Sequence, residues 1–355
     1  MLFKSKNQMI AIDIGTNKTK VVVGSCDAAK NGGGKNHKIT VDEIFAFDTP
    51  LSEAQQPTTK TEEPVYTGSQ VTEEYKPFFN ELQLKTILED ELAKRKVKTD
   101  NATITIDNKP LITREMVMPK ATGDKLRSMI KHEIEEYLPI NVDQYLVDYR
   151  ILEEVMEGDV EKYKLLVGAL PRKIGKYYYD FLKSLHREPV ALDTESNVIS
   201  KGFERDLKIN GQDVGVGGKT IAYIDIGYSN IEMNVIEKGI LKFTRTLENG
   251  VKDIEENVVV EEDRGKIEEE HIGNWLQSLE RMFLFFTSRE TDRKIHEIYL
   301  YGGGAKLKGL SEKMEGALEI PTKVIENLDI IEFNKSCEDC PLSVYLNAIL
   351  SLIRK

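Results

Sequence analysis

The feature that most constrains this sequence is a hairpin motif that occurs twice. The segments AIDIGTNKTKVVVG, around Asp13, and YIDIGYSNIEMNVI, around Asp225, each contain an apolar strand ending in Asp-Ile-Gly, a short polar turn and a returning strand. A third strand pattern follows each copy, ITVDEIFAF in the first half and ILKFTRTL in the second. Each half is therefore predicted to begin with an antiparallel three-stranded meander. This repetition predicts a duplicated α/β fold with two lobes.

The residue types in these hairpins suit phosphate binding. Glycine lets a turn approach phosphate oxygens closely, and the N–H groups of the turn can donate hydrogen bonds to them. An aspartate at the end of the strand can hold Mg²⁺ through water, because this ion prefers few carboxylates and several waters. A single Asp-x-Gly turn is weak support, since hairpin turns favour both residues anyway. Two copies in separate halves predict that a nucleotide is gripped from both sides.

A third glycine-rich motif, YLYGGGAKLKGL, follows the second hairpin. Gly302, Gly303 and Gly304 end a strand pattern and precede a helix pattern. Glycines there permit close approach of the backbone to a base or ribose, and a helix N-terminus favours nearby negative charge. The alternative is that they only make a tight strand-to-helix turn. The order of the three motifs favours a nucleotide site.

Composition narrows the classes of partner. The chain has 355 residues and a net charge of -11, which argues against nucleic acid and against direct docking on an anionic membrane. No apolar run of about 18 residues occurs, so no membrane span is predicted. The first residues lack the apolar core of a signal peptide. The chain has three cysteines, which do not suggest a disulfide framework. Two of them have a C-x-x-C spacing, but a structural zinc site needs two more ligands. We therefore expect the protein to reside in a reducing cytoplasm.

The predicted organisation divides the chain into five parts. They are 1–110, a first lobe with a mobile loop at 49–77; 111–187, an inserted βαββα unit; 188–218, a return to the first lobe and a linker; 219–338, the second lobe; and 339–355, a C-terminal helix packing on the first lobe. The second helix of the inserted unit has an aromatic face that includes Tyr177, Tyr178 and Phe181. We expect this face to pack on the unit's own sheet.

The three motifs in this order resemble the phosphate-1, phosphate-2 and adenosine motifs of the actin, Hsp70 and sugar-kinase superfamily. The resemblance implies a ribonuclease H-like two-lobe fold, ATP and Mg²⁺ as cofactors, and Asp13 and Asp225 as magnesium-binding residues. The residues that it assigns to the nucleotide are Asp13, Gly15, Thr16, Asn17, Lys20, Asp225, Gly227, Tyr228, Ser229, Gly250, Gly302, Gly303, Gly304 and Lys306. Asp193 matches the residue that orients the attacking water, although Asp-Thr-Glu-Ser before a helix is equally typical of a turn or N-cap.

Some residues depart from the superfamily pattern. Tyr228 stands where the second phosphate turn has a small residue, and Asn230 replaces the common threonine. Asn249-Gly250 stands in for Gly-Gly. A bulky tyrosine beside the γ-phosphate position would slow hydrolysis more than it weakens binding. The sequence therefore predicts nucleotide binding with at most slow ATPase activity.

Within the superfamily, the resemblance narrows to the FtsA and PilM branch and covers essentially the whole chain. The inserted unit is similar to the FtsA-type 1C subdomain, while IKHEIEEYLPI, VGALPRKIGKYYYDFLKSL, LERMFLFFTSRE and VYLNAILSLIRK resemble the PilM family. The last helix is apolar nearly all round from Val344 to Ile353, so it is predicted to be buried rather than membrane-binding. This feature favours PilM over FtsA.

Resemblance to the PilM family implies a cytoplasmic adaptor of type IV pilus assembly. Its partner would be the cytoplasmic N-terminal peptide of the inner-membrane protein PilN, which would recruit the chain to the inner face of the membrane and couple the assembly platform to its motor ATPases. A basic peptide segment would suit the acidic surface. Two alternatives stay open at this point: an FtsA-like cytoskeletal protein that self-associates, and a small-molecule kinase of the same superfamily.

Overall fold

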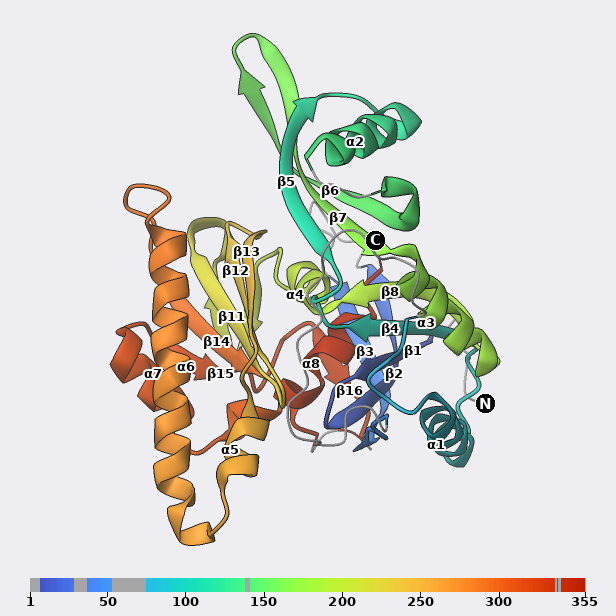
Figure 1. The fold of residues 1–355 in the computed structure, drawn as a ribbon, viewed down its shortest axis with the longest axis vertical. Coiled ribbons are helices and arrows are strands. Elements are labelled where there is room, and N and C mark those ends of the chain that lie inside the picture. Colours follow the sequence, from blue (N-terminus) through green and yellow to red (C-terminus); the bar gives the residue numbers. More distant parts are fainter. Residues whose placement is uncertain are drawn as a thin grey trace.

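The computed structural model describes residues 7–28, 37–52, 75–137, 141–335, 337 and 340–354, which form two lobes and a projecting unit (Figure 1). Each lobe is built on one mixed sheet. The sheet of the first lobe has the order β16 (Ile331–Phe333), β3 (His37–Asp48), β2 (Lys18–Ala28), β1 (Met9–Ile14), β4 (Asn101–Ile106) and β8 (Glu188–Thr194). The sheet of the second lobe has the order β13 (Ile240–Leu247), β12 (Ile231–Glu237), β11 (Thr220–Ile226), β14 (Glu297–Tyr301) and β15 (Thr322–Val324).

The two sheets follow the same plan. In the first, β1, β2 and β3 form an antiparallel meander, and β4 and β8 continue the sheet in parallel beside β1. In the second, β11, β12 and β13 form the meander, and β14 and β15 continue in parallel beside β11. The strands β1 and β11 therefore correspond, and their Asp13 and Asp225 occupy equivalent positions. The predicted duplication and both meanders are confirmed.

The inserted unit forms a separate small layer (Figure 1). Its strands β5 (Ile112–Pro119), β7 (Val160–Pro171) and β6 (Tyr145–Glu157) pair in this order, and all are antiparallel. The helix α2 (Gly123–Tyr137) covers one face of the sheet through Leu126, Ile130 and Ile134, which pack with Leu165 and Val167. The 3.6-residue spacing of these side chains is what makes one side of α2 apolar.

The aromatic helix α3 (Arg172–Ser184) does not pack as expected. Its buried face, with Ile174, Tyr178 and Phe181, shares a core with strands β1 and β4 and with α1 (Glu81–Lys94) of the first lobe. Our expectation that it would pack on the sheet of the inserted unit was wrong. The apolar face of that sheet is already covered by α2, whereas the first-lobe sheet offers α3 an apolar face next to its own connection to β8.

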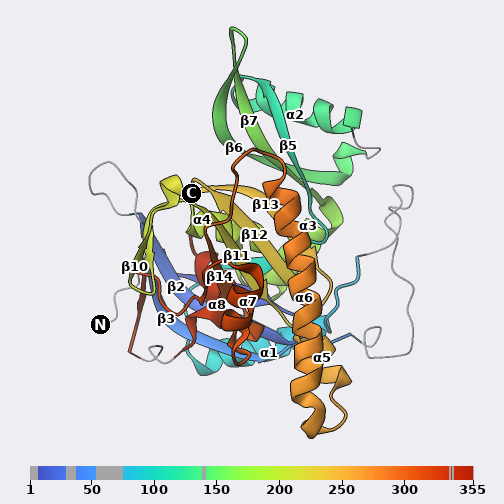
Figure 2. The same cartoon turned by 90° about the vertical axis from the view of Figure 1, so that its left-hand side faces the viewer.

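The second lobe has a long helix on the outer face of its sheet. This helix, α6 (Arg264–Thr287), packs Trp275, Leu279 and Phe283 on the sheet together with α5 (Val251–Asn257) and α7 (Leu310–Leu318). Between the lobes the chain forms α4 (Glu195–Gly202) and a short hairpin of β9 (Leu207–Ile209) and β10 (Gln212–Val214), which Figure 2 shows beside β2 and β3. No described helix has the length and apolarity needed to cross a membrane.

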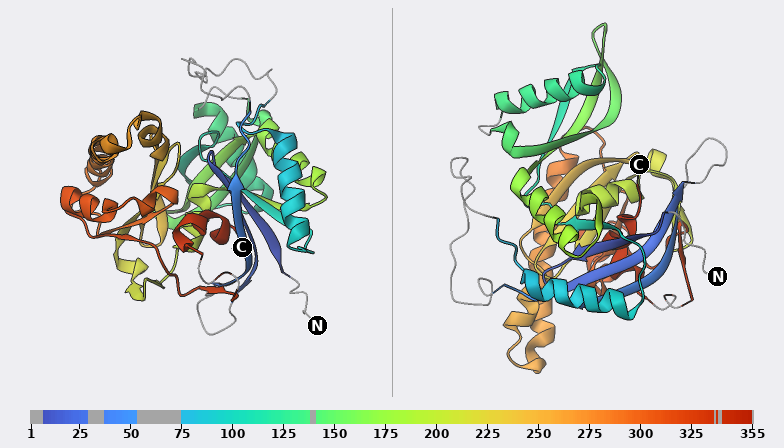
Figure 3. Two further views of the ribbon diagram at one scale, coloured as in Figure 1. Left: turned by 90° about the horizontal axis from the view of Figure 1, so that it is seen from below. Right: turned by 90° about the vertical axis from the view of Figure 1, so that its right-hand side faces the viewer.

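The last helix, α8 (Leu342–Leu350), lies between the two sheets (Figure 3). Its Leu346 and Ile349 belong to a core that contains Ala11 and Val22 of the first lobe and Tyr223 of the second. The prediction that this helix is buried is confirmed. It packs on both lobes, not on the first alone. Most of the loop predicted over 49–77 falls outside the described residues; in its described part, Leu51 forms a bridge with Phe79.

We expect Leu346→Ala to lower the free energy of unfolding by about 2–5 kcal/mol, because it leaves a cavity at a fully buried position. Leu346 is 0% exposed, whereas Leu82 on α1 is 74% exposed. Leu82→Ala is therefore the matched control and should change stability by less than about 0.5 kcal/mol. Urea unfolding followed by circular dichroism measures both. Equal effects of the two substitutions would contradict the placement of α8 in the shared core.

Candidate functional site

The turns of the two repeated hairpins meet at the junction of the lobes. Each is closed by its first glycine, since Gly15 N donates to Lys18 O at 3.2 Å and Gly227 N donates to Asn230 O at 3.0 Å. The hydroxyls of Thr16 and Ser229 then lie 2.6 Å apart, one from each lobe. The two turns that sequence analysis assigned to phosphate thus come together from separate halves of the chain. Asn17 holds its turn in place, because its carbonyl accepts from Thr49 N at 2.9 Å.

A buried lysine joins the two aspartates. Lys20 is paired with Asp13 in the β1–β2 register, and its Nζ lies 3.0 Å from Asp13 Oδ2. Burial lowers the pKa of Lys20, but the carboxylates of Asp13 and Asp225 outweigh burial and hold that pKa above its usual value. On the other side, the Asn347 side chain of α8 donates to Asp225 Oδ2 at 3.0 Å. One positive charge therefore lies between the ends of β1 and β11.

Two further carboxyl groups extend this cluster. Glu232 is directly opposite Asp225 in the β11–β12 register and accepts from Asn234 at 2.8 Å and from the Asn108 side chain. Burial raises the pKa of Asp225 to about 6 and that of Glu232 to about 7. Burial, followed by the Glu232 and Asp225 carboxylates, raises the pKa of Glu195 well above its usual range. The cluster has more carboxyl groups than cations and retains protons near neutral pH.

Asp193 forms its hydrogen bonds with residues outside this cluster. Its carboxylate accepts from Asn197 at 2.5 Å, Lys201 at 2.6 Å and Arg354 at 2.6 Å. Burial raises its pKa, but the two cations outweigh burial and the pKa lies below the usual value. These contacts tie α4 and the chain after α8 to β8, and they do not support the prediction that Asp193 orients a water. Glu195, two residues further on, is the carboxyl group that faces Asp225.

The glycine motif contacts the second hairpin. Gly302 has φ of 87°, and a Cβ there would lie 2.0 Å from Asp225 Oδ1, so only glycine fits. The glycines Gly303 and Gly304 open a single 3₁₀ turn, Gly303–Lys306, in which Lys306 is exposed. We expected the α-helix to open at these glycines, but α7 begins only at Leu310. The left-handed conformation of Gly309 separates the turn from α7.

The remaining predicted residues lie around the second turn. A Cβ on Gly250 would lie 2.2 Å from Tyr228 O, and Gly250 N donates to Asp253 at 2.8 Å at the start of α5. The Tyr228 hydroxyl bonds to Glu255; burial and that carboxylate raise its pKa. The hydroxyl of Tyr228 is therefore directed toward α5, which contains Glu255.

The cluster has the donor set of a magnesium–phosphate site. Buried oxygens of Asn347 (Oδ1) and Glu195 (Oε2) have no hydrogen-bond partner in the described part of the chain, as is expected where a ligand completes a site. Among the described residues, no group of three or more His, Cys, Asp or Glu side chains could hold a metal unaided. Asp13 and Asp225 fit the alternative, in which Mg²⁺ takes few carboxylates and is completed by phosphate and water.

A separate apolar groove lies between the inserted unit and the first lobe. It has a volume of about 330 Å³ and is bordered by β6, β7, β8 and α4. Its apolar lining comes mainly from leucines, namely Leu111, Leu146, Leu166, Leu170, Leu192 and Leu241. Arg150 crosses from β6 to α4 beside them, where it donates to Ser200 at 2.6 Å and to Glu204 at 2.5 Å.

The two equivalent lobes, with one hairpin of each facing the other, form an actin-like two-lobe fold. A family model described as type IV pilus assembly protein PilM matches residues 60–272 and 266–350. The chain therefore belongs to the PilM family, which assigns it to type IV pilus assembly.

Several solved structures are similar to this chain over most of its length. The chain is similar to a PilM-PilN type IV pilus biogenesis complex, with a TM-score of 0.71, 17% sequence identity, and coverage of 98% of this chain and 99% of that chain. The ethanolamine utilization protein EutJ from Carboxydothermus hydrogenoformans gives a TM-score of 0.47 at 12% identity, covering 97% and 88%. A Bacteroides thetaiotaomicron protein with an actin-like ATPase fold gives 0.47 at 10% identity, covering 100% of each chain.

Sequence reasoning missed three residues of the cluster, Glu195, Glu232 and Asn347. The sequence contains a pattern that could have indicated two of them. Glu232 follows from pairing the second hairpin about its turn, which sets it opposite Asp225. Asn347 is a lone amide in an otherwise apolar stretch of α8, and a buried amide needs a partner. Glu195 could not be separated from Asp193 without knowing where α4 begins.

We expect the stability of the protein without added Mg²⁺ to fall as pH rises from about 4 through about 6, in part because of Asp225. The folded pKa of this carboxyl is raised to about 6, so the folded state binds more protons than the unfolded state across that window. Asp225→Asn should flatten the fall by on the order of 2 kcal/mol. Urea unfolding at a series of pH values measures it, with the exposed Asp213→Asn as control. An unchanged slope in Asp225→Asn would count against the buried cluster.

Proposed function

We propose that this chain is an ATP-binding adaptor of type IV pilus assembly, with the nucleotide between the lobes and a PilN peptide in the apolar groove. The observation that carries the nucleotide part is the meeting of the two hairpins, with the Thr16 and Ser229 hydroxyls 2.6 Å apart beside Asp13, Lys20 and Asp225. A site that takes one phosphate-binding turn from each lobe can hold the lobes in one arrangement when it is filled.

Each group in the cluster has a role in this proposal. The turns at Gly15–Asn17 and Gly227–Ser229 donate to phosphate oxygens, and Lys20 adds a positive charge. The glycines at 302–304, with Gly250 and Lys306 nearby, border the adenosine. Mg²⁺, held by Asp13 and Asp225 through water, would neutralise phosphate charge. It would also offset the excess of carboxyl groups in the cluster.

The protonation of the cluster supports slow turnover at most. We assign to Glu195 the water-orienting role that sequence analysis gave to Asp193, because Glu195 interacts with Glu232 and Asp225 of the cluster. Burial and its acidic neighbours raise the pKa of Glu195 well above the usual range. A carboxyl group that keeps its proton is a poor general base at neutral pH. This chemistry favours stable nucleotide binding over rapid hydrolysis.

The apolar groove supports the peptide part. Its leucines offer pockets for a few anchoring side chains, and β6, which forms one wall, is the last strand of its sheet and has a free edge. An extended or helical peptide can use such a site. A solved PilM-PilN complex has the same fold, and PilN is therefore the partner we propose. Binding its cytoplasmic N-terminal peptide would bring the chain to the inner face of the membrane and couple the platform to the motor ATPases.

Calorimetric titration with Mg-ATP tests the nucleotide site. We expect binding by the unmodified chain and at least about tenfold weaker binding by Asp13→Ala and by Asp225→Ala, because each removes a magnesium-holding carboxylate. Asp159→Ala, at the exposed turn between β6 and β7, is the control. The nucleotide assignment fails if the two cluster variants bind Mg-ATP as tightly as the control does.

Titration with a synthetic PilN N-terminal peptide, with and without Mg-ATP, tests the partner. Leu146→Glu should abolish binding, because it places a charge among the groove leucines. Met156→Glu on the same strand is the matched control, since Met156 is 63% exposed and lies outside the groove. A change in peptide affinity with nucleotide would show that cleft and groove are coupled. ATP binding without any peptide binding would remove the support for PilN as partner.

A further inference from the structure

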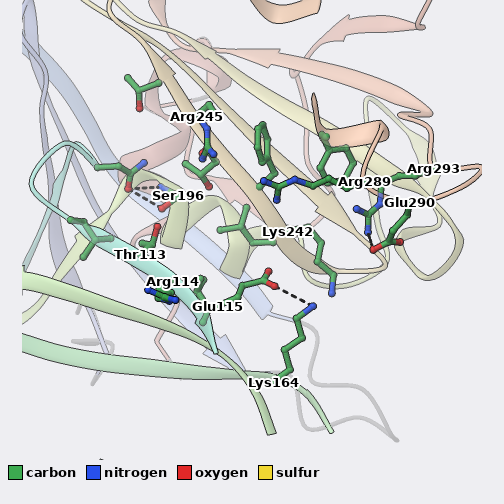
Figure 4. A pocket seen from close by; sticks show the side chains of 18 residues that line it. Thr113, Arg114, Glu115, Lys164, Ser196, Lys242, Arg245, Arg289, Glu290 and Arg293 are labelled. Carbon is green, nitrogen blue, oxygen red and sulfur yellow. Dashed lines mark hydrogen bonds and ion pairs between the residues drawn. The ribbon is translucent and has the colours of Figure 1, made fainter. Parts of the chain in front are cut away.

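A second groove adjoins the apolar groove and lies between the inserted unit and the second lobe (Figure 4). Its volume is about 570 Å³. One wall is formed by β5 and β7 of the inserted unit, and the opposite wall by β13, the end of α6 and the chain that follows it. Asn108 and Ser196 lie at its base. The volume is in the range of specific binding sites.

The groove is basic in an otherwise acidic protein. Among the described residues that line it, the cationic side chains are Arg114, Lys164, Lys242, Arg245, Arg289 and Arg293, and the carboxylates are Glu115 and Glu290. The lining thus has four more positive than negative groups, while the whole chain has a net charge of -11. A concave surface of one sign concentrates ligands of the opposite sign.

Some of these cations are already paired within the protein. Lys164 lies 3.1 Å from Glu115, Lys242 lies 3.2 Å from Glu153 across the groove, and Arg293 lies 3.0 Å from Glu237. Arg245 and Arg289 differ, because no carboxylate in the described part of the chain forms an ion pair with either. Their guanidinium groups lie over phenylalanine rings, Arg245 at 4.5 Å from the Phe243 centroid and Arg289 at 4.2 Å from that of Phe285.

The stacked arginines are ready to bind carboxylates. A guanidinium group held on a ring loses little conformational freedom when it forms a bidentate contact with a carboxylate or phosphate. Figure 4 shows Arg245 and Arg289 on the second-lobe side of the groove, with Arg114 and Lys164 on the opposite side. An anionic ligand in the groove would therefore meet positive charge on both sides.

Both walls also present the edge of a sheet. The strands β5 and β13 are the terminal strands of their sheets. The strand β13 contributes six consecutive residues to the groove, from Leu241 to Thr246, and β5 contributes three, from Thr113 to Glu115. Neighbouring residues of a strand point to opposite faces, so a run of consecutive lining residues means that the strand turns its edge to the groove. Edge strands offer unpaired backbone N–H and C=O groups.

We propose that this groove binds an acidic, extended peptide segment of a partner protein, which pairs with the free edge of β13 and places its carboxylates against Arg245 and Arg289. Backbone pairing with the edge supplies affinity, and alternate side chains supply specificity. A small polyanion would use the charges and leave the edge unpaired. This site adjoins the apolar groove proposed for the PilN peptide, and the two share the lining residues Leu111, Thr113, Leu166, Ser196 and Leu241. Arg245 and Arg289 line this groove and not the apolar one.

The test uses the full chain and a fluorescein-labelled peptide of eight residues, the length of β13, with alternating glutamate and valine. Binding is followed by fluorescence anisotropy at about 50 and 150 mM salt. We expect saturable binding that weakens at the higher salt and falls at least about tenfold in the double variant Arg245→Gln/Arg289→Gln. The matched control is Arg127→Gln/Arg281→Gln, which removes two arginines outside the groove, one of them on α6, the helix that precedes Arg289.

A second peptide separates edge pairing from charge alone. It has the same sequence with alternate backbone amides N-methylated, so it keeps its charge and loses the ability to pair along a strand. We expect it to bind at least about tenfold more weakly. Equal binding of the methylated peptide, or stronger binding by tripolyphosphate than by the acidic peptide, would make the groove a simple anion site and overturn the proposal. Absence of peptide binding, or equal binding by both arginine double variants, would also overturn it.

Discussion

In the described part of the chain, four carboxyl groups, three of them buried, surround one largely buried lysine where the two lobes meet, and this imbalance of charge governs the site. Lys20 and Asp13 come from the first lobe, Asp225 and Glu232 from the second, and Glu195 from the helix between them. Buried charge without a partner is unfavourable. The protein relieves it by retaining protons, and a bound cation would relieve it equally well. Because the groups belong to different lobes, anything that changes their charge changes how the lobes attract each other.

The apolar counterpart of this cluster is α8. It contributes to one core with strands from both sheets, and its Asn347 reaches Asp225. The chain that follows it ends in the buried ion pairs of Arg354 and Lys201 with Asp193. Removing one partner of such a buried pair is costly. The helix α8 therefore joins the two lobes through a shared core, and the residues that follow it tie it to the first lobe.

Much of the fold could be predicted from sequence, because the repeated hairpins show their own register. Asp13 and Asp225 end equivalent strands, and hairpin pairing follows from the turns. The packing of α3 could not be predicted, since its aromatic face is compatible with either of two sheets and the choice depends on which is already covered. The choice between Asp193 and Glu195 depends on where α4 begins. The basic groove joins residues far apart in the chain, and no local pattern reveals it.

The hydrogen bonds of Asn108 have a mechanical consequence. Asn108 stands where the chain leaves β4 for the inserted unit, donates to Glu232 of the second lobe and accepts from Ser196 Oγ at 2.8 Å. Asn108 therefore lies at the base of the inserted unit, which projects as a long arm. Its strand β6 has 13 residues, and a strand of that length spans about 40 Å. A tilt of about four degrees at the root would swing the tip by about 3 Å. The carboxyl cluster thus lies beside the root of the arm, where a small change of tilt becomes a larger displacement at the tip.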